Sequence, residues 1–162
     1  MEPRKHAWIV PGRLAVAERP GGGGRAHRRE RRRAEQAWWR DQGVDLIVSC
    51  MPTRHALVDY VVDGFAVRWH PLTDPESAPA RLRAMAAEAA MLVETGDHVV
   101  LVHGDAATEW LAAVSASLRL QLGLAAGPRE ALAAAAADGL PVGSLASRLL
   151  TGDEPAVTAV AA

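Results

Sequence analysis

The fold is decided by residues 99–111, which read VVLVHGDAATEWL. The run from His98 to Val102 is almost wholly apolar and rich in β-branched residues, which is typical of a strand buried on both faces of a parallel sheet. A seven-residue loop follows it, and residues 110–122 have the pattern of a helix that Gly123 ends. In parallel α/β sheets, ligands bind where strands end and loops enter helices. Residues 103–110 are therefore the first candidate site.

Further strands and helices alternate on both sides of this unit. The clearest helix lies between Ser77 and Gly96, where apolar residues recur at three- and four-residue steps. The other predicted elements are two short strands within 8–17, strands at 44–49 and 65–69, and helices at 27–42, 55–62, 128–138 and 141–150. In the helix at 27–42, Ala34, Ala37 and Trp38 are expected to form the packed face. The pattern predicts one three-layer α/β/α domain over 1–150, with a central, mostly parallel sheet of about four or five strands.

Two segments are expected to lie outside the ordered core. Residues 18–28 contain four consecutive glycines among arginines, and fixing such glycines costs conformational entropy, so a flexible loop is predicted. The tail 151–162 has no apolar period and is predicted to be disordered.

Composition excludes several classes of protein. The 162 residues are 49% hydrophobic and 23% charged, with a net charge of −1, so the whole molecule has no strong attraction for nucleic acid or an anionic membrane. No apolar run approaches the roughly 18 residues that cross a bilayer, and the N-terminus lacks the apolar stretch of a signal peptide. The single cysteine, Cys50, excludes an internal disulfide and fits a reducing, cytoplasmic environment.

The loop after Val102 resembles the signature loop of the cysteine-based dual-specificity and protein-tyrosine phosphatases. In that family a buried strand ends in His-Cys, five residues follow, and Arg with Ser or Thr opens a helix. The loop amides and the helix N-terminus bind phosphate, the cysteine attacks as thiolate, and the arginine holds the phosphate oxygens in a bidentate grip. Other stretches are similar to the family between Trp8 and Leu150: an opening hairpin at 11–20, a Gly-Val-strand element at 43–49, and the general-acid loop at 69–74.

The matching positions lack the residues that do the chemistry. His103 matches the family's histidine, but Gly104 stands at the cysteine, Trp110 at the arginine and Leu111 at the Ser/Thr. Asp74 occupies the place of the general acid, where it would have no phosphoenzyme step to serve. The resemblance therefore implies a pseudophosphatase, with no catalytic residue and with Asp74, His103, Gly104 and Trp110 as positional remnants. Trp110 is expected to pack over the former phosphate pocket and fill it.

Two acids argue against anion binding in the loop itself. Two unit charges about 4 Å apart interact by roughly 4 kcal/mol at the effective dielectric of a protein surface, so Asp105 and Glu109 are expected to repel a phosphate dianion with no arginine nearby to offset them. The candidate ligand loop, with anion binding disfavoured, comprises His103, Gly104, Asp105, Ala106, Ala107, Thr108, Glu109 and Trp110.

Two other functions stay open beside the inactive domain. One is a phospho-ligand binding module, and the other is a hydrolase that works without the cysteine, for instance through a metal held by His70, Asp74 and His103. Both histidines stand where the family has structural histidines, and Asp74 precedes Pro75 as a turn former, so no metal and no cofactor are expected.

A protein partner is expected at the arginine-rich helix. Adjacent helical positions lie about 100° apart, so of Trp38 and Trp39 one can be core while the other is partly exposed beside the Arg25–Arg33 segment. Trp and Arg are enriched at binding hot spots, although a solvated helix face is the simplest interpretation. Glu30, Glu35 and Asp41 dilute the positive charge and disfavour nucleic acid as the partner.

Overall fold

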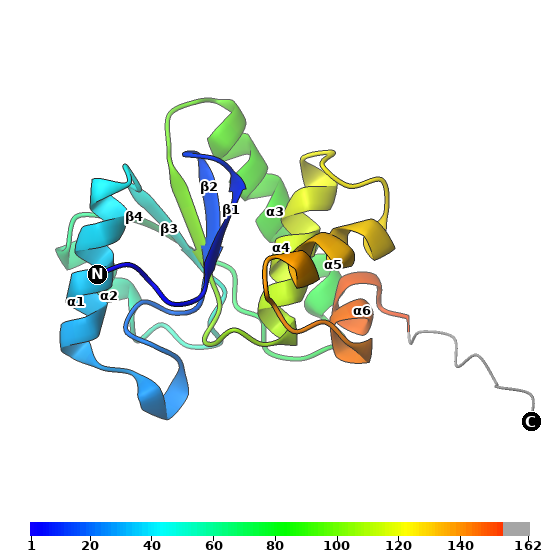
Figure 1. The fold of residues 1–162 in the computed structure, drawn as a ribbon, viewed down its shortest axis with the longest axis horizontal. Coiled ribbons are helices and arrows are strands. Elements are labelled where there is room, and N and C mark those ends of the chain that lie inside the picture. Colours follow the sequence, from blue (N-terminus) through cyan, green and yellow to red (C-terminus); the bar gives the residue numbers. More distant parts are fainter. Residues whose placement is uncertain (154–162) are drawn as a thin grey trace, which may run out of the picture.

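The computed structural model describes residues 1–153, which form a five-stranded sheet in the order β1-β2-β5-β3-β4 (Figure 1). The strands are β1 His6–Val10, β2 Leu14–Ala17, β3 Leu46–Ser49, β4 Ala66–Trp69 and β5 Val100–His103. Only β1 is antiparallel to its neighbour; β2, β5, β3 and β4 run parallel. The predicted fold class is confirmed. The predicted tail falls outside the described residues from 154 on.

Helices cover both faces of the sheet. On one face lie α1 Arg29–Asp41 and α2 Leu57–Val62, and on the other lie α3 Ala78–Glu94, α4 Glu109–Gln121, α5 Pro128–Ala137 and α6 Ser144–Thr151 (Figure 1). Among residues 1–153, no helix combines the length and the apolar composition needed to cross a membrane.

Strand β5 joins the two cores because its side chains alternate between the faces. Val100 and Val102 belong to the larger core under α3 and α4, whereas Leu101 belongs to the smaller core under α1 and α2. All three are fully buried, as expected for the central strand of a parallel sheet. The carboxyl end of β5 is therefore held from both sides, which positions the loop that follows it.

Helix α1 buries a different face from the one expected. Ala37 is exposed, while Arg32, Glu35, Gln36 and Trp39 are buried. The prediction was wrong because it followed apolar residues only. Here ion pairs and hydrogen bonds keep charged side chains inside: Arg31 binds Glu35 and Glu18, and Arg32 binds Asp59.

The glycine-rich loop between β2 and α1 packs against the candidate site loop. Arg19 N donates to Asp105 O at 3.3 Å, and Gly24 N donates to Asp105 Oδ1 at 3.2 Å. A Cβ added at Gly23 would lie 2.5 Å from Asp105 O and 2.7 Å from Ala106 Cβ. The predicted flexibility of 18–28 stays a prediction, but these contacts give at least one of its glycines a steric role.

Because Gly23 lies so close to Asp105 and Ala106, we predict that Gly23→Ala destabilises the protein by about 1–3 kcal/mol, the usual cost of overpacking. The backbone of Gly23, at φ −79° and ψ 153°, is open to alanine, so the cost comes from the contact alone. Gly127→Ala is the matched control, because Gly127 is also an extended residue preceding a helix and has nothing within 4 Å of an added Cβ. Urea unfolding measures both variants. Equal stability changes would contradict the packing of the glycine loop on Asp105 and Ala106.

Candidate functional site

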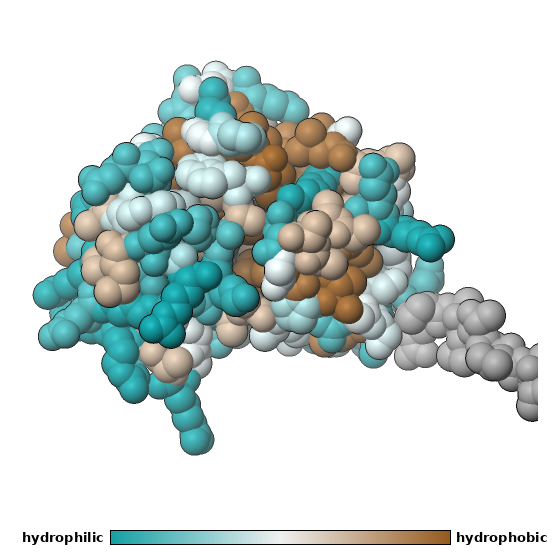
Figure 2. All heavy atoms as spheres, in the orientation of Figure 1, coloured by the Kyte–Doolittle hydropathy of each residue, from teal (hydrophilic) through white to brown (hydrophobic). Residues whose placement is uncertain are grey.

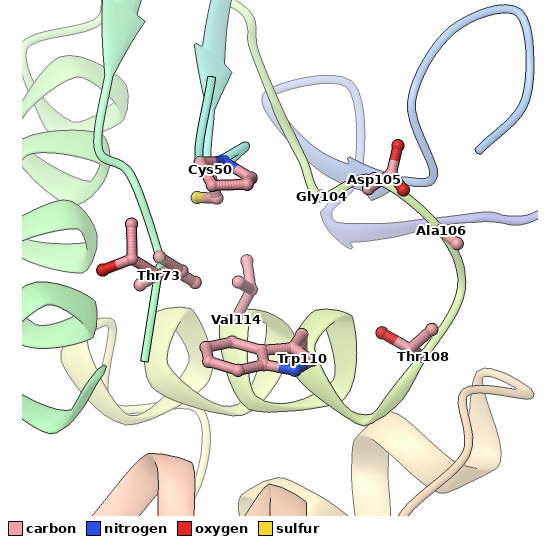
Figure 3. A pocket seen from close by; sticks show the side chains of 10 residues that line it. Cys50, Thr73, Gly104, Asp105, Ala106, Thr108, Trp110 and Val114 are labelled. Carbon is pink, nitrogen blue, oxygen red and sulfur yellow. The ribbon is translucent and has the colours of Figure 1, made fainter. Parts of the chain in front are cut away.

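The candidate site is a pocket of about 340 Å³ at the carboxyl edge of the sheet, between β3, β5 and the start of α4 (Figure 3). It is lined by Cys50, Pro52, Leu72, Thr73, Gly104, Asp105, Ala106, Thr108, Trp110 and Val114. Five of these residues belong to the loop predicted from the sequence, and the others come from the ends of β3 and β4 and from α4. The strand-loop-helix geometry thus brings the expected segment to a concave surface.

His103 is a fixed structural residue beneath this pocket. Its ring is fully buried, with Nδ1 at 2.8 Å from Gly104 O and Nε2 at 3.1 Å from the Tyr60 hydroxyl. Burial lowers the pKa of His103 to about 4, so the ring is neutral at pH 7. Because a carbonyl oxygen only accepts, Nδ1–H donates to Gly104 O, and Nε2 accepts from Tyr60. The histidine therefore holds the first peptide of the loop in place.

Gly104 adds no side chain to the pocket at the first position after β5. Its N–H donates to Ala17 O at 3.4 Å, and an added Cβ would have only ordinary contacts, 3.8 Å to Leu111 Cδ1 and 3.9 Å to Ala106 O. A Cβ can therefore be accommodated at this position, so packing does not require a glycine here.

Cys50 lines the same pocket, which sequence reasoning missed. It follows β3 directly, and its N–H donates to His103 O at 2.9 Å. A usable signal existed: parallel neighbouring strands end at one sheet edge, so residues after β3 and β5 must lie close together. Burial raises the pKa of the Cys50 thiol to about 12, which leaves roughly one thiolate in 100,000 molecules at pH 7. The thiol faces the pocket as a neutral group and not as a nucleophile.

Both acids of the loop have partners of their own, which corrects the expectation that nothing nearby offsets them. Asp105 Oδ1 lies 3.7 Å from Arg19 Nη1 and accepts from Gly24 N, and Figure 3 shows its carboxylate pointing away from the cavity. Glu109 Oε1 accepts from Ala146 N at 3.2 Å, at the start of α6. The sequence could not show these contacts because their partners lie 37 to 86 positions away.

Trp110 lines the pocket and does not fill it. The indole is half-buried, packs against the larger core, and lies along one wall across from Cys50 (Figure 3). The structure does not bear out the expectation that this side chain fills the pocket, since the cavity stays open beside it. A tryptophan at the first turn of α4 gives this wall a flat apolar surface.

Asp74 and His70 take part in other local contacts. Asp74 accepts from Ser77 N and Ser77 Oγ, each at 2.8 Å, and from Thr73 Oγ1 at 3.0 Å. The bonds from Ser77 first, and then that from Thr73, hold the pKa of Asp74 below its usual value. His70 instead binds Glu88, which also accepts from Arg68 Nε at 2.8 Å. His70, Asp74 and His103 therefore bind separate partners, and no three His, Cys, Asp or Glu side chains of residues 1–153 gather as a metal site.

The buried histidine predicts an acid-dependent stability. Its pKa is about 4 when folded and about 6.5 when unfolded, so between these pH values only the unfolded chain binds the proton. The contribution of the neutral His103 to the free energy of unfolding is complete above pH 6.5, and about 3 kcal/mol of it is lost as the pH falls to 4. Urea unfolding from pH 7 to pH 4 should show this slope in the wild type and a shallower one in His103→Asn. Parallel slopes would exclude His103 as the titrating group.

Comparison with solved structures places this geometry among phosphatases. The chain matches no protein-family model, and no curated protein sequence matches it. Human DUSP28 superimposes with a TM-score of 0.66 at 18% identity, over 94% of this chain and 95% of that one. Tk-PTP in its active form superimposes with a TM-score of 0.63 at 22% identity, over 92% of this chain and 95% of that one.

A third similar structure is the kinase associated phosphatase in which the catalytic-site cysteine is substituted by serine. It has a TM-score of 0.63 and 19% identity, over 85% of this chain and 83% of that one. At these identities the likeness concerns architecture, and the overlap includes nearly the whole chain on both sides. The protein therefore has the fold of the dual-specificity and tyrosine phosphatases.

Proposed function

We propose that this protein is a catalytically inactive, phosphatase-like domain. The observation that carries the proposal is the content of the pocket after β5: Gly104 stands where the family has its nucleophile and Trp110 where it has its phosphate-binding arginine. Cysteine-based hydrolysis needs a thiolate to attack phosphorus and a cation to hold the oxygens, and the pocket lining offers neither.

The other groups in the pocket do not supply a substitute nucleophile. The Cys50 thiol is neutral because burial raises its pKa to about 12. Thr108 has no histidine, lysine or carboxylate as a hydrogen-bond partner in the described part of the chain that could act as its general base. A metal-assisted hydrolase is a weaker candidate because His70 and His103 are each held by other residues.

A phospho-ligand module is also less well supported than an inactive domain. The pocket lining contains no lysine, arginine or histidine, and its one charged residue is Asp105. Glu109 places a carboxylate in the first turn of α4, where it offsets the positive end of the helix dipole. An anion entering this pocket would lose its hydration without gaining a counter-charge.

The proposal predicts that neither the wild type nor Gly104→Cys hydrolyses an aryl phosphate. An added Cβ makes only ordinary contacts at this position, but no guanidinium lines the pocket to hold the phosphate oxygens. Release of p-nitrophenol from p-nitrophenyl phosphate, with and without divalent metals, should equal the buffer rate for both proteins and for the matched Gly104→Ser control. Turnover by rigorously purified wild type would refute the inactive domain. Turnover by Gly104→Cys alone would refute the need for the arginine.

We further propose that the domain acts by binding an acidic segment of a partner protein, in a cytoplasmic setting that suits its one unpaired cysteine. Arginines of the Arg25–Arg33 segment divide into two groups. Arg31 and Arg32 are tied to Glu18, Glu35 and Asp59. Within the described part of the chain, the exposed members form no ion pair: Arg25, Arg28, Arg29 and Arg33. Figure 2 shows this corner of the molecule as strongly hydrophilic.

One of the two adjacent tryptophans is available to such a partner. Trp39 is fully buried, whereas Trp38 is half-buried, with its ring 4.8 Å from that of Trp39 and 5.2 Å from that of His6. The exposed arginines, which form no ion pair among residues 1–153, and the partly exposed Trp38 indole are residue types that favour an acidic protein segment over RNA for a chain of net charge −1.

Charge reversal tests the acidic partner. A fluorescently labelled oligoglutamate peptide should bind the wild type, and Arg29→Glu/Arg33→Glu should weaken binding about tenfold, since exposed ion pairs contribute up to about 1 kcal/mol each. Arg83→Glu/Arg129→Glu changes the net charge equally at exposed arginines elsewhere and should leave binding nearly unchanged. Fluorescence anisotropy at low and high salt provides the measurement. Equal effects of the two double variants would mean that the Arg25–Arg33 segment is not the docking surface.

A further inference from the structure

The pocket after β5 has one apolar part and one hydrogen-bonding group. Cys50, Leu72 and Val114 belong to the larger core, and the Trp110 indole forms a flat wall next to them. Thr108 lies at the other end. Its side chain makes no capping bond to α4 and no other hydrogen bond among residues 1–153, and Figure 3 shows its hydroxyl oxygen facing the cavity. The lining can therefore bury an apolar group and satisfy one polar atom.

The charges of the lining select against ions. Asp105 is the only charged residue in it, and its carboxylate is directed to Arg19 and Gly24. No side-chain cation lines the cavity, so an anion entering it would gain no counter-charge for its lost hydration. A cation would have no carboxylate aimed at it. An uncharged ligand avoids both costs.

The size and shape of the pocket narrow the class of ligand further. A volume of about 340 Å³ lies at the lower end of the range of small-molecule sites, roughly 300–1,000 Å³. The indole of Trp110 offers a face on which a planar ring can stack in an offset arrangement. A single ring with one polar substituent matches the apolar part, the flat wall and the free hydroxyl together.

We propose that this pocket binds a small, uncharged aromatic molecule that carries one hydroxyl or carbonyl group. The ring lies between Trp110 and the side chains of Cys50 and Leu72, and the polar group hydrogen-bonds to Thr108 Oγ1. This assignment rests on the proposed loss of catalysis and names the ligand chemistry of the same site. The former anion pocket has thus become a site for a neutral ring.

A matched pair of probes tests the preference for a neutral ligand. Titration of 4-methylphenol into the ¹⁵N-labelled protein should shift the amides of Ala106 and Thr108 and the Trp110 indole N–H, saturating with a Kd on the order of 1 mM. The ester 4-methylphenyl phosphate has the same ring and a dianion, and it should bind at least tenfold more weakly. Tighter binding of the ester, or shifts scattered over the surface without saturation, would overturn the proposal.

Two variants locate the ligand, with toluene as a second probe that has the ring but no hydroxyl. Thr108→Val keeps the size of the side chain and should weaken the binding of 4-methylphenol about fivefold, the value of one neutral hydrogen bond, while the binding of toluene is unaffected. Trp110→Leu should weaken the binding of 4-methylphenol and of toluene about tenfold or more. Val62→Ser, at a residue 78% exposed on α2 on the opposite face of the sheet, is the control and should change neither. If Thr108→Val weakened the binding of toluene and of 4-methylphenol equally, the assigned hydrogen bond would be refuted. This test does not depend on whether Trp110→Leu folds.

The two proposals for this site fail in different ways. Hydrolysis of 4-methylphenyl phosphate by the wild type would refute the inactive domain, whatever 4-methylphenol does. Tight binding of the ester without hydrolysis would refute the neutral-ligand pocket and leave catalytic inactivity standing.

Discussion

Parallel pairing of β5 with both β2 and β3 is the constraint on which the site depends. The pairing puts Ala17 and Ser49 in register with His103. Three loops therefore leave the sheet at one edge: residues 18–28, the segment that begins at Cys50, and the loop from Gly104. Parallel strands must end together at the carboxyl edge, so segments far apart in the chain meet there without any local preference to do so.

Hydrogen bonds from several elements hold the loop at this edge of the sheet. His103 binds Gly104 O on one side and Tyr60 on the other, and the glycine loop hydrogen-bonds to Asp105. These contacts hold the backbone of the loop, and none of them requires a nucleophile or an arginine. Buried hydrogen bonds of this kind fix the shape of a loop independently of which side chains it presents to the pocket. A cavity stays open at this edge, because Trp110 lies along its wall and Gly104 adds no side chain.

Much of this architecture could be predicted from sequence. Strand and helix patterns are local, since apolar periodicity and the glycines that end helices are read within a few residues. This is why the strands and α-helices of residues 1–153 fall close to where the patterns indicated. The identities of residues 104 and 110 are equally local information, because they concern which residue stands at which step after an apolar strand. The buried face of α1 was mispredicted because its charged residues find partners on other elements, such as Asp59 for Arg32.

The sequence by itself determined the α/β class, the position of the loop after the central strand, and the lack of a cysteine and an arginine in it. Only the tertiary structure decided that Cys50 lines the pocket, that Asp105 and Glu109 face away from it, and that it stays open beside Trp110. The physical reason is distance along the chain: Asp105 accepts from Gly24, 81 positions away, and Glu109 from Ala146, 37 positions away. A residue type and its spacing define what a segment can form, whereas the direction of a side chain depends on partners that only folding brings near.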